Sequence, residues 1–94
     1  AIGDRRRVAF CWEGIAMALT RLAVLAAPTD EAALQRAVGL FAKADSLRRE
    51  IDAPLPASER AEYDACLSQA AAHLSTGRYA EAWDRGIHQK QSDG

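Results

Sequence analysis

Apolar residues return at every third or fourth position through four stretches of this chain, and this spacing most limits what the chain can fold into. Residues spaced in this way share one face of an α-helix, because a helix completes a turn in about 3.6 residues. Prolines or a glycine interrupt the pattern at three places, residues 28–30, 52–58 and 75–77. We therefore predict four helices, over residues 4–27, 30–51, 58–74 and 78–89.

The ends of these predicted helices carry residues that suit a helix terminus. Asp4, Asp30 and Ser58 can each accept a hydrogen bond from a backbone N–H in a first helical turn. Arg48 and Arg49 lie in the last turn of the second helix, where positive charge complements the helix dipole. Because the connections are short, consecutive helices should be antiparallel. The expected fold is all-α, with antiparallel helical hairpins in a single domain over residues 1–94.

Each predicted helix has an apolar stripe that we expect to form one shared core, and each of the two tryptophans lies on such a stripe. The stripes comprise Val8, Trp12, Ile15, Leu19, Leu22 and Ala26 in the first helix; Leu34, Ala37, Phe41, Ala44, Leu47 and Ile51 in the second; Tyr63, Leu67, Ala70 and Leu74 in the third; and Tyr79, Ala82, Trp83, Gly86 and Ile87 in the fourth.

The first helix carries a second apolar side, on which Phe10, Met17 and Val24 recur every seven residues. A helix that is apolar on two sides needs partners on both. Either the third and fourth helices fold back over this side, or it docks a preceding repeat or a second copy of the chain. We favour docking, and expect the isolated chain to form a homodimer. Arg6 is the fourth candidate interface residue. The arginine run at residues 5–7 opposes the helix dipole and could pair with acidic residues of a neighbour, although we favour a solvated face for this run.

Charge and composition exclude several classes of function. Lys and Arg number 12 against 13 Asp and Glu, so the chain lacks the basic surplus that binds nucleic acid. The apolar stretch at residues 14–27 contains Arg21 and is shorter than the roughly 20 residues of a membrane span, so we expect a buried helix and no membrane segment. No signal-peptide pattern and no initial Met are present, which suggests a piece of a longer protein. The two isolated cysteines make a disulfide framework unlikely and favour a reducing, cytoplasmic compartment.

Residues that could carry chemistry have plainer explanations. His73 and His88 have no acid or nucleophile paired with them, and Cys11 and Cys66 stand alone among apolar residues without a metal-ligand spacing. We expect surface histidines and small buried cysteines. The acidic residues Glu59, Glu62 and Asp64 suit the start of a helix. We therefore predict no catalytic residue, no cofactor, no metal and no enzymatic activity.

Two segments resemble tetratricopeptide repeats, helix pairs that pack through small residues. They are Leu19-x2-Leu22-Ala23-x2-Ala26 with Ala37-x3-Phe41-x2-Ala44, and Leu74-x2-Gly77-Arg78-Tyr79-x2-Ala82. Longer strings are similar to the end of the tetratricopeptide-like region of bacterial signal-transduction ATPases of the maltose-regulator and antibiotic-regulator type. They are Gly3-Asp4-Arg5-Arg6-Arg7-Val8-Ala9, Trp12-Glu13-Gly14-Ile15-Ala16, and Ala53-Pro54-Leu55-Pro56-x2-Glu59-Arg60-Ala61-x-Tyr63-Asp64 followed by Ala80, Ala82 and Trp83. The repeat register departs from the family pattern around residues 20–35.

This resemblance implies a tetratricopeptide-like solenoid fragment of about four helices. It also implies protein–protein interaction and signal transmission within a bacterial transcriptional regulator, with nucleotide hydrolysis and DNA reading elsewhere. The sequence contains neither a Gly-rich phosphate loop nor a DNA-reading helix-turn-helix signature. A helical domain that senses a small-molecule inducer is the alternative. A pocket of convergent polar groups would favour the inducer, and a flat or grooved apolar surface would favour a protein partner.

Overall fold

The computed structural model describes the backbone of residues 2–93 and the side chains of residues 3–88. Over this part of the chain there are four helices and no strand. They are α1 (Ile2–Leu25), α2 (Glu31–Glu50), α3 (Ala57–His73) and α4 (Thr76–Asp93). The predicted all-α fold is confirmed, and each predicted helix is present with ends shifted by a few residues.

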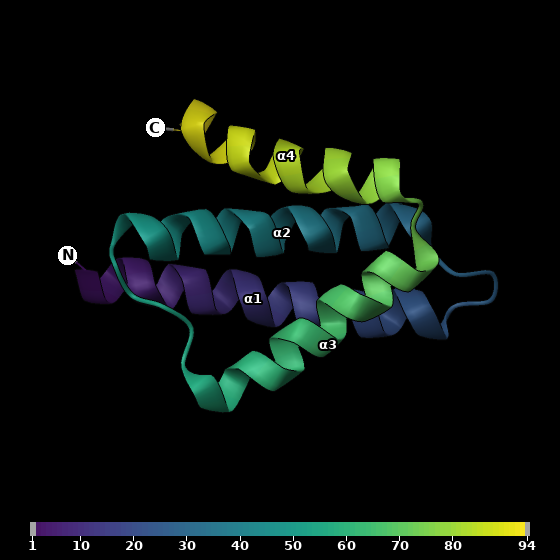
Figure 1. Cartoon of the computed structure of the whole chain (residues 1–94), viewed down its shortest axis with the longest axis horizontal. Helices are drawn as coiled ribbons and strands as arrows, with labels where there is room; N and C mark the ends of the chain where they lie inside the picture. The colour runs from purple at the N-terminus through teal and green to yellow at the C-terminus, as the bar shows by residue number, and fades with distance from the viewer. Residues whose placement is uncertain (1, 94) are drawn as a thin grey trace.

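The helices are not arranged as two equivalent pairs (Figure 1). The first pair, α1 and α2, lies side by side and antiparallel, as expected. Helix α4 lies along the other side of α2 and runs in the same direction as α2. Helix α3 crosses obliquely and makes more of its contacts with α1 than with α4, with which it shares few. The long helix α2 is therefore the central element of the fold.

Small residues bring α1 close to α2. Ala9, Ala16 and Ala23 recur every seven residues on α1 and are almost completely buried. Each belongs to a separate buried cluster with residues of α2, so three clusters follow one another along the helix pair. Their α2 members are Leu34 and Val38 near Ala23, Ala37 and Phe41 near Ala16, and Ala44 and Leu47 near Ala9.

This packing turns the large apolar residues of α1 outward, so the core stripe expected for the first helix was wrong. Val8, Ile15 and Leu22 are exposed, and Trp12 and Leu19 are only half-buried. The reason is geometric: a helix that buries its alanine side must present the opposite side to solvent. The stripes expected for the other three helices are confirmed at their central residues, including Phe41, Tyr63 and Ala82.

Two helix starts can be compared directly with their expected caps. The Asp30 carboxylate accepts a hydrogen bond from the backbone N–H of Ala33 at 3.1 Å, which confirms the predicted cap of α2. Asp4 was expected to cap the first helix, but α1 already includes Ile2. Asp4 therefore lies within the first turn, where its charge still complements the helix dipole.

The later two helices begin earlier than predicted. Pro56 precedes α3 without a side-chain cap, and Ser58 lies inside the helix. The Ser75 hydroxyl accepts a hydrogen bond from the backbone N–H of Arg78 at 3.2 Å, so a serine caps α4. Gly77, expected to separate the helices, lies in the first turn of α4.

Helix α1 is long and apolar enough to cross a membrane, judged by length and composition alone over Gly3–Leu25. The expectation from the sequence considered only residues 14–27, a shorter stretch than the whole helix, and the absence of a membrane segment stays a prediction. The criterion is weak, since core helices of soluble proteins and signal sequences also meet it. In this fold one side of α1 packs on α2, and that side includes the buried carboxylate of Glu13.

Candidate functional site

The outward side of α1 is a continuous apolar strip, which we call the exposed α1 face. Its larger residues are exposed to solvent, by 40% for Val8, 52% for Ile15, 67% for Leu22 and 81% for Leu25. Smaller exposed residues lie between them at alternating steps of three and four. The complete face comprises Val8, Cys11, Ile15, Ala18, Leu22 and Leu25.

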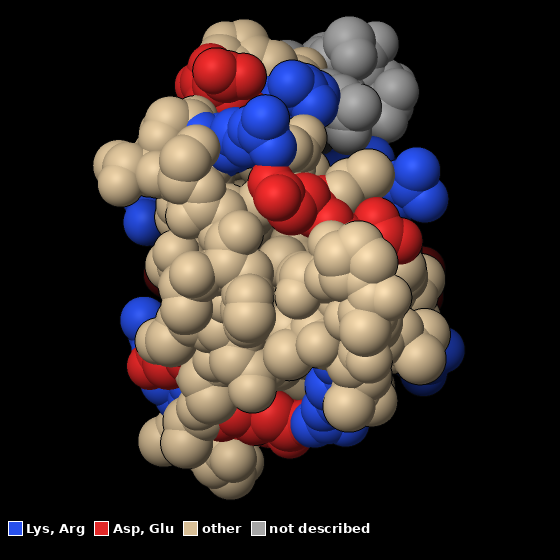
Figure 2. Space-filling view, turned by 90° about the vertical axis from the view of Figure 1, so that its right-hand side faces the viewer, with Lys and Arg blue, Asp and Glu red and all other residues tan. Residues whose placement is uncertain are grey.

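No charged side chain interrupts this face. Between Val8 and Leu25 the only charged residues of α1 are Glu13 and Arg21. Glu13 is on the buried side, and Arg21, at the flank, forms an ion pair with Glu62 of α3. Figure 2 shows the end of the molecule where α1 gives way to α2; its middle is mostly uncharged, and Lys, Arg, Asp and Glu lie mainly above and below. Helix α1 is seen end-on there, so the figure shows the end of the helix and not the length of this face.

The four predicted interface residues lie elsewhere and do not share one environment. Phe10 and Arg6 are exposed. Met17 is half-buried and packs on the cluster that contains Phe41, and Val24 is half-buried beside the cluster that contains Leu74. Contrary to expectation, packing within the chain therefore covers Met17 and Val24 in part. A role for these residues at an interface stays a prediction.

Phe10 stands at a groove between α1 and the start of α3. One hollow of about 570 Å³ is lined by Arg6, Arg7 and Phe10 on one side and by Pro54 and Glu59 on the other. A smaller hollow of about 170 Å³ continues past Phe10 toward Met17. The groove is thus partly apolar, with arginines near one end and carboxylates along the α3 side.

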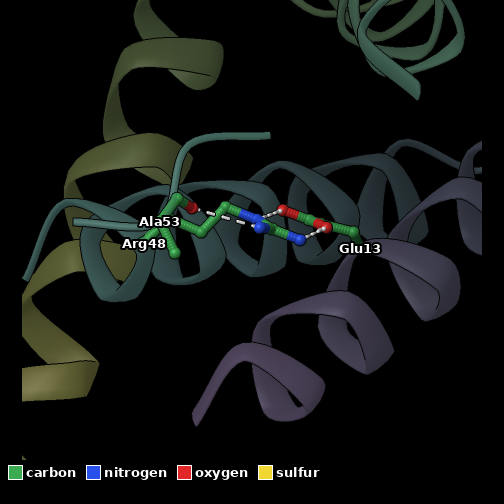
Figure 3. Close-up of polar contacts among 3 residues, drawn as sticks. All are labelled: Glu13, Arg48 and Ala53. Atoms are coloured by element: carbon green, nitrogen blue, oxygen red, sulfur yellow. Dashed lines mark hydrogen bonds and ion pairs between the residues drawn. The ribbon is translucent and has the colours of Figure 1, made fainter. Parts of the chain in front are cut away.

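A buried ion pair joins α1 to α2 (Figure 3). The Glu13 carboxylate accepts hydrogen bonds from Nε of Arg48 at 2.6 Å and from Nη2 at 2.9 Å, while Nη1 donates to the carbonyl of Ala53 at 3.2 Å. Only 3% of Glu13 and 7% of Arg48 are exposed. The hydrogen bonds to Glu13 raise the pKa of Arg48 above its usual value, against the opposing effect of burial. The two-pronged geometry fixes α1 and α2 in register.

The end of α2 supplies the third partner of this guanidinium. Asp52 adopts a left-handed backbone conformation, with φ of 54°, which aspartate tolerates better than most residues. The chain then turns back, and the Ala53 N–H donates to the Arg48 carbonyl at 2.9 Å. This turn brings the Ala53 carbonyl within reach of the Arg48 side chain.

A pocket of about 290 Å³ lies beside the ion pair. Asp45, Arg49, Arg60 and Tyr63 contribute to its lining. Burial, with smaller contributions from Asp45 and Glu13, raises the pKa of the Tyr63 phenol, so this group is neutral at ordinary pH. Among the described side chains no buried nitrogen or oxygen lacks a hydrogen-bond partner. The buried charges here are therefore satisfied within the chain and do not require a ligand.

The other candidate residues have simple surroundings. His73 and His88 are exposed, as expected for surface histidines. The expectation that no acid accompanies His88 was wrong, because its Nδ1 lies 3.5 Å from Oδ1 of Asp84, one helical turn earlier. Cys66 is buried, and its burial raises the pKa of its thiol, whereas Cys11 is exposed and not buried as expected. Cys11 follows Val8 on the outward side of α1, which explains the difference.

The carboxylates at the start of α3 do not form a cluster. Glu62 pairs with Arg21, and the Asp64 carboxylate lies 3.8 Å from Nε of Arg60 one turn earlier. In the described part of the chain no three His, Cys, Asp or Glu side chains are placed to hold a metal ion.

Neither the buried Glu13–Arg48 ion pair nor the exposed α1 face was predicted from the sequence. The signal for the ion pair was Glu13, the single acidic residue between Val8 and Leu25 of α1, although nothing in the sequence identifies Arg48 as its partner. The signal for the exposed α1 face was the series of alanines at positions 9, 16 and 23, which marks a side of close helix approach.

Comparison of the chain with family models, curated proteins and solved structures finds no match in any of the three. The resemblance to the repeat region of bacterial regulators therefore stays a prediction.

Proposed function

We propose that this chain is a protein–protein interaction module, and that the exposed α1 face is its contact surface. The observation that supports the proposal is the uncharged strip on α1, with Ile15, Leu22 and Leu25 more than half exposed. Large contiguous apolar patches on soluble proteins usually mark interaction sites. The resemblance noted in the sequence adds the context of signal transmission within a bacterial transcriptional regulator.

The size of the patch supports a contact of measurable strength. Burying apolar surface contributes roughly 25 cal/mol per Å², so covering Leu22 and Leu25 alone would contribute about 1–2 kcal/mol each. Ile15 and Val8 extend the same strip toward the N-terminus. A partner that covered the whole strip would therefore gain several kcal/mol before its own entropy losses.

The groove beside Phe10 favours the alternative, a small-molecule (inducer) site. Its volume of about 570 Å³ falls in the range of ligand pockets. Arg6 and Arg7 would attract an anionic group there. We rank this function second because the groove is open at the surface and its lining mixes both signs of charge.

Cys11 offers a direct test, since its thiol lies within the exposed α1 face. In the full-length protein carrying Cys66→Ala, a maleimide should label Cys11 at least about tenfold more slowly before denaturation than after, because a partner surface shields it. A matched control combines Cys11→Ser and Cys66→Ala with Ser68→Cys, at an exposed position of α3. Equal labelling rates at the two positions would contradict the proposal.

A further inference from the structure

We infer that the exposed α1 face binds the same face of a second copy of this chain, with the two α1 helices antiparallel. This inference rests on the proposed function, which assigns the exposed α1 face as a contact surface. It adds that the partner is a second copy of the chain and that the two α1 helices are antiparallel. Three features of the face support it: its repeat, the order of large and small residues along it, and the charge at its two ends.

The repeat of the face matches a helical partner. Val8, Ile15 and Leu22 recur every seven residues, and Cys11, Ala18 and Leu25 follow them at the same interval. Apolar residues spaced alternately by three and four along a helix are those that interlock with a second helix, since the spacing keeps them facing it over several turns. All of these residues remain exposed to solvent in the structure.

The large and small side chains along the face fit those of a second copy only when the two α1 helices are antiparallel. If a two-fold axis passes between Ile15 and Ala18, each small residue of the face meets a large one, and two large residues meet only at the ends of the face. The facing pairs are then Val8 with Leu25, Cys11 with Leu22, and Ile15 with Ala18 of the second copy. A parallel pair would place Cys11 against Cys11 and Ala18 against Ala18, which leaves gaps that cost packing energy.

Charge favours the same direction. The arginine run at residues 5–7 lies near the N-terminus of α1, mostly in its second turn, and the last turn has no basic residue. An antiparallel partner brings Arg7, which precedes Val8, toward the carbonyl end of the second α1, where positive charge is favourable. A parallel partner would instead bring the two arginine runs together.

The contact is small for a permanent dimer. From Val8 to Leu25 the face extends for about 26 Å along the helix, from the rise of 1.5 Å per residue. One helix pair of this length buries less than the roughly 800 Å² per partner of a standard stable interface. We therefore expect a reversible dimer that dissociates on dilution.

The substitution Leu22→Cys tests both partner and direction. In the antiparallel dimer the new thiol at position 22 faces Cys11 of the second copy, and symmetry repeats this contact. Mild oxidation by oxidised glutathione should then give a covalent dimer, at least about tenfold more than the unmodified chain gives, because only facing thiols meet disulfide geometry. A link within one α1 is excluded, since positions 11 and 22 lie about 16 Å apart along the helix.

The control is the double variant Leu22→Cys with Cys11→Ser, which keeps the buried Cys66. It should give no more covalent dimer than the unmodified chain, because the two thiols at position 22 lie far from each other in the antiparallel pair. A covalent dimer of the unmodified chain through Cys11 would show a parallel pair and overturn the inference.

Light scattering supplies a second measurement. Ile15→Glu should abolish the dimer with helicity retained, since the residue is already exposed in the monomer. Phe10→Glu, off the face, should leave dimerisation within about twofold. A chain that stays monomeric at every concentration reached, with no crosslink by Leu22→Cys, would overturn self-pairing. The labelling of Cys11 in the full-length protein would then still decide the proposed function separately.

Discussion

The backbone of α4 at Gly86 lies directly against the backbone of α2 at Gly39. A Cβ atom placed on Gly86 would lie within 2.8 Å of the Cα and carbonyl carbon of Gly39, closer than real Cβ contacts. The reverse is not true, because a Cβ on Gly39 would lie 3.5 Å from the Ala82 carbonyl oxygen, an ordinary contact. Gly86 is thus the residue that allows α4 to pack on α2.

We predict that Gly86→Ala destabilises the fold. The new methyl group would meet backbone atoms that cannot rotate away, so α4 must move from α2 at a cost of about 1–3 kcal/mol. Alanine gains roughly 1 kcal/mol over glycine inside a helix, so a net loss of up to about 2 kcal/mol should remain. Urea unfolding followed by circular dichroism measures the change. Gly39→Ala is the matched control and should be neutral or stabilising; equal effects of the two substitutions would contradict the close approach described.

A second prediction concerns the Glu13–Arg48 ion pair. Arg48→Met leaves the Glu13 carboxylate buried without its partner and should lower the free energy of unfolding by about 3–5 kcal/mol. Replacing both residues, Glu13→Leu with Arg48→Met, should recover most of this loss because no buried charge remains. Urea unfolding monitored by tryptophan fluorescence provides the measurement.

Arg49→Met serves as the control for this prediction. Arg49 pairs with Asp45 at 3.0 Å, but its side chain is largely exposed. An exposed pair contributes at most about 1 kcal/mol, so the variant should be nearly as stable as the unmodified chain. If Arg48→Met were as mild as Arg49→Met, the pair would not be the buried contact between α1 and α2 that the structure describes.

The helices were predictable because their signals are local. A period of three to four residues and the interruptions at residues 28–30 and 52–58 depend on neighbours in the sequence, and so does the cap at Asp30. The choice of buried side on α1 is not local. Both sides are apolar, and the large residues Ile15 and Leu22 suggested a core, but α2 accepts the alanine side because it permits closer approach.

The buried ion pair and the exposed α1 face were less predictable for the same reason. Glu13 and Arg48 are 35 residues apart, and only the register of α1 on α2 makes them partners. The helix dipole alone already explains an arginine in the last turn of a helix, so the sequence around Arg48 does not indicate a second partner. Cys11 was assigned to the core because its neighbours are apolar, which holds for either side of α1.

A third prediction follows from the buried phenol of Tyr63. Burial raises its pKa in the folded chain, so above about pH 10, where an unfolded tyrosine loses its proton, the folded chain retains it. The unfolded state then binds fewer protons than the folded state, and stability falls as pH rises through this range. Below it, Tyr63 contributes no pH dependence. Urea unfolding at a series of pH values from neutral to alkaline measures the slope.

Tyr63→Phe should make this slope shallower while preserving the core. The phenyl ring can keep the edge-to-face contact with Phe41, whose ring centroid lies 5.0 Å from that of Tyr63. Part of the slope should remain, because burial also raises the pKa of Tyr79. An unchanged alkaline slope in Tyr63→Phe would show that Tyr63 ionises as easily in the folded chain as in the unfolded one.

The last prediction is that α3 opens before the rest of the fold. Only Tyr63, Cys66 and Ala70 of this helix are buried, its first turn has no side-chain cap, and it shares fewer contacts with its neighbours than α1 and α2 share with each other. Segments with few buried contacts open at a lower free energy than global unfolding.

In a Cys11→Ser variant, Cys66 is the single thiol, and its labelling by an excess of maleimide therefore reports this opening. The free energy from labelling in low urea should be smaller than that from circular dichroism, with a weaker dependence on urea, because less surface is exposed. Equal free energies and equal urea dependences would mean that α3 unfolds only together with α1, α2 and α4.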